Sequence, residues 1–279
     1  MDCVSSPYRP APRKALKEMN VTKSRAKTNT TVICRFDADH IFVRDKNLVE
    51  QIMGHYSMVQ LFLLQATGSE PTPLQCKIIE TVMVTIMEHG LVPSAVVTRL
   101  TLHGAPESYQ GAVASGLLGV GDRYAGTASA CAGLLDRILQ ADSDQAHRVA
   151  DELVASLIAA AKPVPGFGHP VHRERDGRVD RLIELLEEMQ VEGRHLAALR
   201  VLESSVRRVS GKPLVTNTSA AIAAALGEAN LPIGLMRGVV LIARCAGLVG
   251  HLYEETLQPV AHELWSGAQG AVPTENSSN

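Results

Sequence analysis

Helical spacing of apolar residues continues almost without interruption from Leu48 toward the C-terminus, and this feature restricts the possible folds more than any other. The clearest stripe consists of Val179, Leu182, Ile183, Leu186 and Met189. Residues spaced in this way lie on one face of a helix and can be buried together. After Val43 there is neither an Asn-Gly hairpin turn nor a sustained alternation of apolar and polar residues, so strands are not expected there. The pattern predicts an all-α protein of about ten helices.

The expected helices cover residues 48–67, 72–88, 93–102, 108–118, 124–139, 145–161, 179–189, 195–209, 219–228 and 233–257. Two boundaries carry specific signals. Gly68 is placed to end the first helix, and Thr72 with Pro73 forms an N-cap and first-turn pair that opens the second. The sequence after Trp265 is small and polar, so the tail is expected to be frayed.

Charge is divided unevenly between the first 30 residues and the remainder. The 279 residues have a formal net charge of −2, but residues 1–30 contain seven Lys and Arg residues against two acidic ones. We interpret this segment as a mobile basic arm, with an organellar transit peptide as the alternative. The remaining body has 20 basic and 27 acidic residues, which argues against binding to nucleic acid or to an anionic membrane surface.

Cysteine usage and hydropathy bear on the compartment. The five cysteines are scattered, odd in number and never spaced as Cys-x-x-Cys. This argues against a disulfide framework or a zinc site and for a reducing compartment, with the cytoplasm as the default. The most apolar stretch, residues 238–252, is interrupted by Arg244 and His251, so no transmembrane helix is expected.

Residues 163–177 contain three prolines and three glycines between two predicted helices and are rich in His and Arg. His169 follows the Gly166-Phe167-Gly168 turn, and Arg173 and Arg178 lie just beyond it. A neutral imidazole can donate a hydrogen bond to a carbonyl or alkoxide oxygen, and Arg binds carboxylate or phosphate through a fork of N–H groups. A ligand site is therefore one interpretation of this segment.

Other interpretations of the same segment remain open. Glu174 and Asp176 alternate with the arginines, as in a solvated loop of mixed charge. A metal site would use His169 and His172, but no nearby Cys or acidic cluster completes the ligand set. Residues 119–126 resemble a phosphate-binding loop only weakly, because the GxGxxG spacing and a preceding strand are missing. A junction between helices explains that loop equally well.

Two further residues have both a structural and a functional interpretation. His89 follows a predicted helix and precedes Gly90, a place where the helix dipole favours histidine and a glycine ends the helix. It can also bind a ligand. Arg244 lies in the apolar run 239–247, and burying its charge unpaired would cost several kcal/mol. Its partner is either a substrate anion or an internal carboxylate.

Four segments, taken in order, resemble the citrate synthase superfamily over roughly residues 34–265. Residues 166–178, Gly-Phe-Gly-His-Pro-Val-His-Arg-Glu-Arg-Asp-Gly-Arg, resemble its G-[YF]-G-H-x-V-x-R-x-x-D-x-R signature. Residues 88–90, Glu-His-Gly, resemble the Asp-His-Gly of the citryl-CoA lyase branch, and residues 243–247 resemble its Ser/Gly-Arg-x-x-Gly. The loop at 119–126, Gly-Val-Gly-Asp-Arg-Tyr-Ala-Gly, is also closer to that branch, which includes the equivalent module of ATP-citrate lyase.

The resemblance implies an all-α, citrate synthase-like fold with the active site in a cleft between two domains. The large helical domain would comprise residues 31–160 and 215–268, the small helical domain residues 161–214, and residues 269–279 a polar tail. It also implies an obligate homodimer that uses a coenzyme A thioester as substrate, with no tightly bound cofactor and no metal. The implied chemistry makes or breaks the bond between the α-carbon of an acyl-CoA and the ketone carbon of a 2-oxo acid such as oxaloacetate.

Transferred by position, the resemblance gives each candidate residue a role. His169 would hydrogen-bond the oxaloacetate carbonyl, or the citryl hydroxyl in the cleavage direction. Substrate carboxyl groups would be held by His89, Arg178 and Arg244. Coenzyme A would be bound by Arg173 at a phosphate and by Gly166, Gly168 and Asn217.

Two catalytic positions depart from the family pattern. Tyr124 stands where the synthases place a His that polarises the thioester oxygen, although ATP-citrate lyase also has an aromatic residue there. Ser219 replaces the Asp that removes or returns the α-proton of the acyl-CoA. A neutral hydroxyl cannot take over the work of that base, and loss of a general base costs on the order of 10²–10⁴-fold in rate.

Three hypotheses follow. The enzyme cleaves a citryl-CoA-like thioester in a retro-Claisen step, with Tyr124 or water protonating the enolate. Alternatively, it acts on a different acyl-CoA whose acidity or own carboxylate replaces the missing base, or it binds acyl-CoA without turnover. A helical scaffold is a further, non-enzymatic alternative, but the sequence has no internal repeat.

Overall fold

The computed structural model describes residues 30–168, 176–212 and 214–272. Within them, a three-stranded antiparallel sheet in the order β1-β2-β3 precedes a long series of helices. The strands are β1 (Cys34–Phe36), β2 (Ile41–Val43) and β3 (Lys46–Asn47), and the short π-helices are η1 (Leu48–Ile52) and η2 (Asp122–Gly126). The α-helices are α1 (Met58–Thr67), α2 (Pro73–Met87), α3 (Pro93–Gly104), α4 (Tyr109–Leu118), α5 (Thr127–Leu139), α6 (Ala146–Ala159), α7 (Gly177–Glu188), α8 (Arg194–Ser210), α9 (Thr218–Glu228), α10 (Ile233–Leu257) and α11 (Ala261–Ala271).

The helices confirm the all-α prediction and most of the predicted boundaries. α10 begins and ends at the predicted residues. The side chain of Thr72 accepts a hydrogen bond from the Gln75 N–H at the start of α2, and the Gln75 side chain accepts one from the Thr72 N–H. Gly68 ends α1 in the left-handed conformation, with φ +77°. Local capping signals were therefore sufficient to place these ends.

The single helix predicted for residues 48–67 is wrong, because the structure divides it into η1 and α1. Gly54 adopts φ +78° between the two. Ser57 then opens α1 by accepting a hydrogen bond from the Gln60 N–H at 3.2 Å. The apolar stripe continues across this break, but the two short helices have different neighbours: η1 packs against β2 and β3, and α1 packs against α2.

β3 lies where no strand was expected. Val43 pairs with Lys46, so the chain turns at two residues, of which Arg44 has φ +57°. The Arg44 guanidinium donates to the Gln65 carbonyl at the end of α1 through Nε at 2.9 Å. This contact attaches the small sheet to the helical body. The predicted basic arm, apart from its last residue, lies outside the described residues.

The tail is more ordered than predicted, because α11 continues to Ala271 rather than fraying after Trp265. The Glu255 carboxylate in α10 accepts hydrogen bonds from the Val260 N–H at 2.9 Å and the Ala261 N–H at 2.8 Å. These are the otherwise unpaired donors of a helix start, and a negative charge there stabilises the helix. The composition of the tail gave no sign of this cap.

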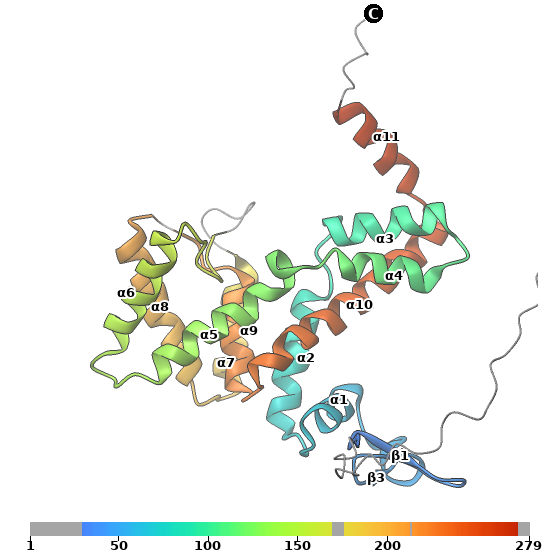
Figure 1. Ribbon diagram of the computed structural model, residues 1–279, viewed down its shortest axis with the longest axis horizontal. Coiled ribbons are helices and arrows are strands. Elements are labelled where there is room, and N and C mark those ends of the chain that lie inside the picture. Colours follow the sequence, from blue (N-terminus) through green and yellow to red (C-terminus); the bar gives the residue numbers. More distant parts are fainter. Residues whose placement is uncertain (1–29, 169–175, 213, 273–279) are drawn as a thin grey trace, which may run out of the picture.

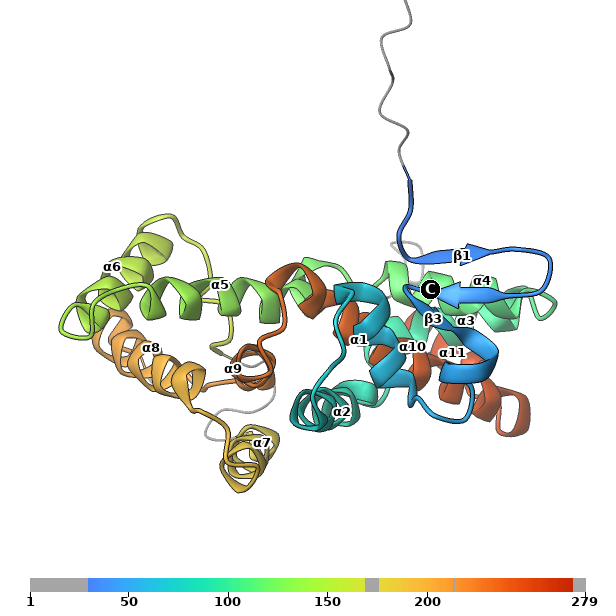
Figure 2. The same ribbon diagram turned by 90° about the horizontal axis from the view of Figure 1, so that it is seen from below.

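α9 is the centre of the main core (Figure 2). It lies between α5 and α7 and also packs against α2 and α8. Its buried stretch from Ala220 to Ala225 is almost entirely alanine, and such small side chains allow neighbouring helices to approach closely. α10 then crosses from the end of α9, past α2, to α3 and α4 (Figure 1).

The predicted boundary between domains at residue 160 runs between two helices that pack together. α6, predicted for the large domain, lies along α8, predicted for the small one (Figure 1). The division into two domains stays a prediction.

Among the described helices, α10 alone is long and apolar enough to cross a membrane by length and composition. Core helices of soluble proteins pass the same test. α10 packs against α2, α3, α4 and α5, and its polar residues Arg244, His251 and Glu255 are buried. About 33% of its most apolar 18-residue window is buried, so these contacts account for part of its hydropathy.

Candidate functional site

Two segments distant in sequence lie side by side at the start of α9. The Gly168 N–H donates to the Val215 carbonyl at 2.7 Å, and the Asn217 N–H donates to the Gly166 carbonyl at 2.9 Å. This short antiparallel pairing brings together three residues that were predicted to bind coenzyme A: Gly166, Gly168 and Asn217.

Glycine is required on the first of these segments for two reasons. Gly166 has φ +89° and Gly168 has φ +83°, a region that other residues rarely adopt. A Cβ atom on Gly166 would also lie 2.7 Å from the Cβ of Ala220 in α9. The backbone therefore rests directly against α9, and its position is fixed by that contact.

Asn217 holds this pairing to the helix. Its side-chain Nδ2 donates to the Gly168 carbonyl at 2.9 Å, and its Oδ1 accepts the Ser219 N–H at 3.0 Å as the N-cap of α9. The amide of Asn217 is thus engaged within the protein. Ser219, the predicted replacement for a catalytic carboxylate, lies in the first turn of α9 and is half-buried.

Asp176 joins the start of α7 to the start of α9. Its carboxylate accepts Nε of Arg178 at 3.1 Å and Nη2 at 2.9 Å, and it accepts the Thr218 hydroxyl at 2.7 Å. Burial alone would raise the pKa of Asp176, but the bonds from Arg178 and Thr218 outweigh it and hold the pKa far below its usual range. The carboxylate is therefore charged and orients the guanidinium of Arg178.

Replacing Asp176 by asparagine should lower stability by about 2 kcal/mol at pH 7, because charge-assisted bonds to a buried carboxylate are lost. The native pKa lies below the unfolded value of about 4, so the stabilisation is present above that pH and is lost as the pH falls through and below it. Urea unfolding at pH 7 and at about pH 3 should show a shallower acid dependence in the variant. Asp151→Asn is the matched control, because the Asp151–Arg208 pair is half-exposed and should contribute under about 1 kcal/mol. Equal losses in the two variants would contradict this assignment.

Arg244 reaches the end of α2 from α10. Nη1 donates to the carbonyls of Ile86 and Met87, each at 3.3 Å, and Nη2 donates to the Ser94 hydroxyl at 3.3 Å. Burial lowers the pKa of Arg244, and the charge of Glu88 opposes that shift. Of the residues that the structure describes, none places a carboxylate within 4.0 Å of this guanidinium. The internal carboxylate considered above is therefore not a direct partner among them, and the substrate anion stays a prediction.

His89 lies where two positive charges meet. Burial lowers its pKa first, and the charges of Arg178 and Arg244 lower it further, while Glu88 and Asp176 act in the opposite direction. The shift indicates that side chains from α7 and α10 share one electrostatic environment with the residue that follows α2. Arg244 also contacts the Met87 carbonyl, and α7 packs against α2, so the three residues lie in one region of the fold, and their role in holding substrate carboxyl groups stays a prediction.

Some predicted site residues cannot be placed. His169 and Arg173 lie outside the described residues, as does His172, on which the metal alternative depended. Tyr124 belongs to η2 by its backbone, but its side chain is not described. In the part of the chain that the structure covers, no group of three His, Cys, Asp or Glu side chains is arranged to hold a metal ion.

Three supporting residues were missed by the sequence interpretation. Asp176 had been considered as a loop charge and as a signature residue without a role, although its place two residues before Arg178 at a helix start is typical of an N-cap. Glu88 was treated as part of a short string without a role. His251 was noted only as an interruption of an apolar run, although it lies seven residues after Arg244 and therefore on the same face of α10.

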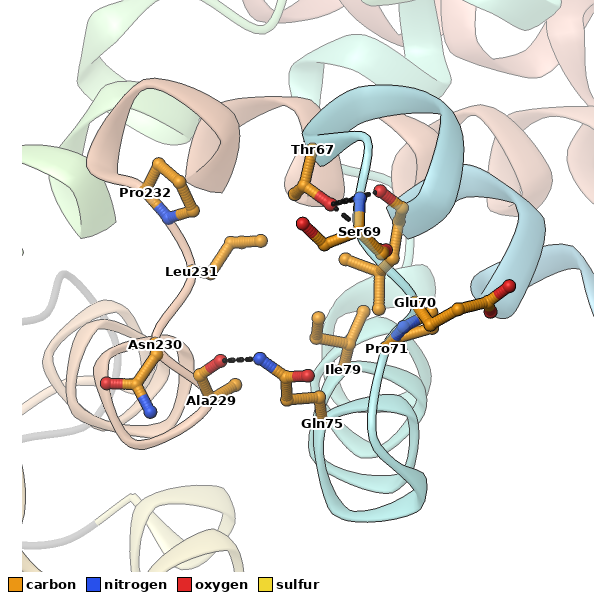
Figure 3. A pocket seen from close by; sticks show the side chains of 11 residues that line it. Thr67, Ser69, Glu70, Pro71, Gln75, Ile79, Ala229, Asn230, Leu231 and Pro232 are labelled. Carbon is orange, nitrogen blue, oxygen red and sulfur yellow. Dashed lines mark hydrogen bonds between the residues drawn. The ribbon is translucent and has the colours of Figure 1, made fainter. Parts of the chain in front are cut away.

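A cavity in the described chain lies away from these residues (Figure 3). It has a volume of 260 Å³ and lies between the N-terminal end of α2 and the turn that joins α9 to α10. The lining residues are Leu63, Thr67, Ser69, Glu70, Pro71, Gln75, Ile79, Ala229, Asn230, Leu231 and Pro232. His89 follows the other end of α2, about 20 Å away along the helix. This cavity contains none of the predicted site residues.

A family model, citrate synthase, C-terminal domain, matches residues 8–262. The chain therefore belongs to the citrate synthase family. A search among curated protein sequences found no match. Of the four segments that carried the resemblance, one lies at the end of α2, and two others lie at the start of α7 and in α10, helices that both pack against α2.

Solved structures agree with this membership. Citryl-CoA lyase from Hydrogenobacter thermophilus is 26% identical, with a TM-score of 0.73 over 83% of this chain and 88% of that one. ATP citrate lyase from Methanosaeta concilii, in complex with (3S)-citryl-CoA, is 20% identical, with a TM-score of 0.69 over 92% of this chain and 43% of that one. Citrate synthase from Thermotoga maritima is 18% identical, with a TM-score of 0.59 over 73% and 55%. The latter two show the citrate synthase-like fold alone.

Proposed function

We propose that this chain makes or breaks the carbon–carbon bond between the α-carbon of an acyl-CoA and the ketone carbon of a 2-oxo acid such as oxaloacetate. The observations that carry the proposal are the family membership and the placement of two arginines near the end of α2: Arg244 donates to the Met87 carbonyl, two residues before His89, and Arg178 lies at the start of α7, which packs against α2. Two guanidinium groups beside an imidazole of lowered pKa suit a ligand with several carboxylates and a carbonyl or hydroxyl oxygen. The likeness to a citryl-CoA lyase supports citryl-CoA as the thioester.

In the cleavage direction, His169 would hydrogen-bond the citryl hydroxyl and accept its proton on the imidazole as the carbon–carbon bond breaks. The hydroxyl oxygen becomes the ketone of oxaloacetate, and the electrons of the broken carbon–carbon bond pass to the acetyl-CoA enolate. The α-carbon then takes a proton from Tyr124 or water. Arg178 and Arg244 would hold the carboxylates throughout, which positions the breaking bond and stabilises developing charge.

Coenzyme A enters the proposal as part of the substrate, with no tightly bound cofactor. Arg173 would contact a phosphate, and the backbone of Gly166 and Gly168 would line the path of the thioester arm. Asn217 supports this path by holding Gly168 to α9. The side-chain amide of Asn217 already forms hydrogen bonds within the protein. We therefore propose that Asn217 supports the shape of the coenzyme A path and does not itself bind coenzyme A.

Ser219 leaves the α-proton without the carboxylate that the family uses to remove or return it, so another group, Tyr124 or water, must exchange that proton. Synthesis needs a base to remove a weakly acidic α-proton, and a serine hydroxyl is not one at neutral pH. The same residue supports two alternatives: an acyl-CoA that supplies its own acidity or carboxylate, and a homologue that binds acyl-CoA without turnover.

We further propose a homodimer in a reducing compartment such as the cytoplasm. Large apolar side chains are exposed on α3, α4 and α10, which pack together (Figure 1). They include Val97, Tyr109, Leu118, Tyr253 and Leu257. Soluble monomers rarely expose large contiguous apolar patches. The molecular mass of the protein in solution tests whether it is a dimer. The four cysteines in the described residues are free, which is compatible with that compartment.

Titration calorimetry with oxaloacetate, coenzyme A and acetyl-CoA tests the proposal before any turnover assay. We expect saturable binding of both ligand classes. Arg178→Ala should weaken oxaloacetate about 10- to 100-fold, because a charge-assisted contact to a carboxylate is removed, and Arg173→Ala should weaken coenzyme A.

Arg181→Ala is the matched control for the oxaloacetate titration. Arg181 lies one turn further along α7 and pairs with Glu184 and Glu188 on the exposed side. The Arg181→Ala variant loses the same charge as Arg178→Ala, but on the exposed side of α7. Equal effects of Arg178→Ala and Arg181→Ala, or no binding of either ligand class, would overturn the proposed function.

A further inference from the structure

A buried polar network connects α3 and α10 beside the candidate site. Arg99 in α3 is 2% exposed, and its guanidinium contacts three residues of α10. Nη1 donates to Glu255 at 2.7 Å, Nη2 donates to Glu254, and Nε lies 3.1 Å from Nδ1 of His251. The carboxylates of Glu254 and Glu255 balance the buried charge, so the guanidinium of Arg99 has its ionic partners within the protein.

The contact with Arg99 fixes the tautomer of His251. A guanidinium has only N–H donors, so Nδ1 of His251, which also lies 2.8 Å from Nη2, must be the acceptor. The ring proton of the neutral imidazole is therefore on Nε2. That atom lies 3.0 Å from the carboxylate of Glu88, and it is oriented to donate to it.

Glu88 contacts both His251 and the backbone of the two residues that follow it. Its Oε1 accepts the His89 N–H at 2.8 Å and the Gly90 N–H at 2.5 Å. Burial alone would raise the pKa of Glu88, but these N–H groups and His251 lower it, so the carboxylate is charged. One carboxylate thus joins α10 to the backbone that carries His89.

The same face of α10 makes the neighbouring contacts. Arg244, Gly247 and His251 are spaced by three and four residues and lie along one side of the helix. Arg244 donates to the last carbonyls of α2, and a Cβ on Gly247 would lie 2.0 Å from the Met87 carbonyl oxygen. α10 therefore packs closely against the end of α2, and His251 contacts Glu88, the residue that follows α2.

We propose that His251 is a positioning residue: through Glu88 it fixes the backbone of His89 and thereby sets the affinity of the site for its carboxylate ligand. The second part rests on the proposed function, in which His89 holds a substrate carboxyl group. The first part is a property of the free protein.

Three variants separate the contacts of His251. In His251→Asn the side-chain oxygen replaces Nδ1 as the acceptor for Arg99, but the amide nitrogen is too short to reach Glu88. In His251→Gln the longer amide can donate to Glu88, so this variant should restore the link. Glu88→Ala removes the link from its other side.

Gln75→Ala serves as the matched control. Gln75 lies at the opposite end of α2, where its Nε2 donates to the Ala229 carbonyl at 2.9 Å. Its loss weakens the packing of the same helix without touching residues 88–90. Any effect of general destabilisation appears in this variant as well.

Amide hydrogen exchange of His89 and Gly90 in the free protein, followed by NMR, tests the positioning. We expect it to be about tenfold faster in His251→Asn and in Glu88→Ala, near the wild-type rate in His251→Gln, and unchanged in Gln75→Ala. Unchanged exchange at both amides in His251→Asn would overturn the positioning role.

Calorimetry tests the consequence for the ligand. Oxaloacetate should bind about tenfold more weakly to His251→Asn, with coenzyme A unaffected. The double variant with Glu88→Ala should be no weaker than Glu88→Ala alone, because both changes break one link. Equal weakening of the two ligands, or additive losses, would overturn the inference. If the wild-type protein binds no oxaloacetate, the proposed function fails, and the exchange rates alone decide the positioning role.

Discussion

Replacing Gly247 by alanine should cost about 3 kcal/mol or more in the free energy of unfolding. The added Cβ would stand 2.0 Å from the Met87 carbonyl oxygen and 3.0 Å from its carbon. Both atoms belong to the backbone of α2, so no side chain can rotate away, and α10 must separate from α2. Inserting atoms into a tightly packed contact typically costs about 1–3 kcal/mol, and this contact lies at the severe end. Urea unfolding and a fall in Tm of roughly 6–12 °C measure the effect.

Gly250→Ala is the matched control for that experiment. Gly250 lies three residues further along α10 and has no atom within 4 Å of the position of a Cβ. The same substitution there should be neutral or stabilise the helix by up to about 1 kcal/mol. The variants should differ in ligand binding too, because Gly247→Ala moves Arg244 and His251 away from the end of α2. Equal stabilities of the two variants would show that the close approach of α10 and α2 is not as described.

The positions of the helices were largely predictable from the sequence because their signals are local. α10 was predicted with its exact bounds, since an apolar stretch between a proline and a polar turn is visible along the chain. The division of residues 48–67 was not predicted, because apolar periodicity continues across a break that only Gly54 and Ser57 mark. α11 was missed for a different reason: its cap is Glu255, a residue of the preceding helix.

The candidate site was predictable where residue types within short segments indicated a function. It was not predictable where the site depends on contacts between distant residues. The roles of His89, Arg178 and Arg244 followed from the resemblance of short segments to the family, and only Arg244, a charge within an apolar helix, had an independent physical reason. Glu88 and His251 lie 163 residues apart in sequence, so nothing local to either one indicated the pair. The sequence could not show which groups contact Arg244 either. In the structure its guanidinium donates to two backbone carbonyls and a hydroxyl.

A Ser219→Asp variant should exchange the methyl protons of acetyl-CoA with heavy water about 100-fold faster than the wild-type protein, or more. Removal of this proton needs a base, and a positioned carboxylate contributes on the order of 10²–10⁴-fold. The substitution should be tolerated by the fold, because residue 219 is half-buried in the first turn of α9, where a negative charge is favoured by the helix dipole. Exchange is followed by NMR or mass spectrometry of recovered acetyl-CoA.

Ser219→Asn is the matched control, since asparagine has the shape of aspartate but cannot act as a base. If only the aspartate variant accelerates exchange, the missing carboxylate is what limits synthesis in this chain, and the cleft still places acetyl-CoA against the start of α9. If the aspartate and asparagine variants exchange equally slowly while acetyl-CoA still binds, then a base at residue 219 is not aligned with the α-carbon. The acyl-CoA would in that case lie in a different register from the one that the family resemblance implies, and the proposal of a citryl-CoA reaction at Ser219 would have to be abandoned.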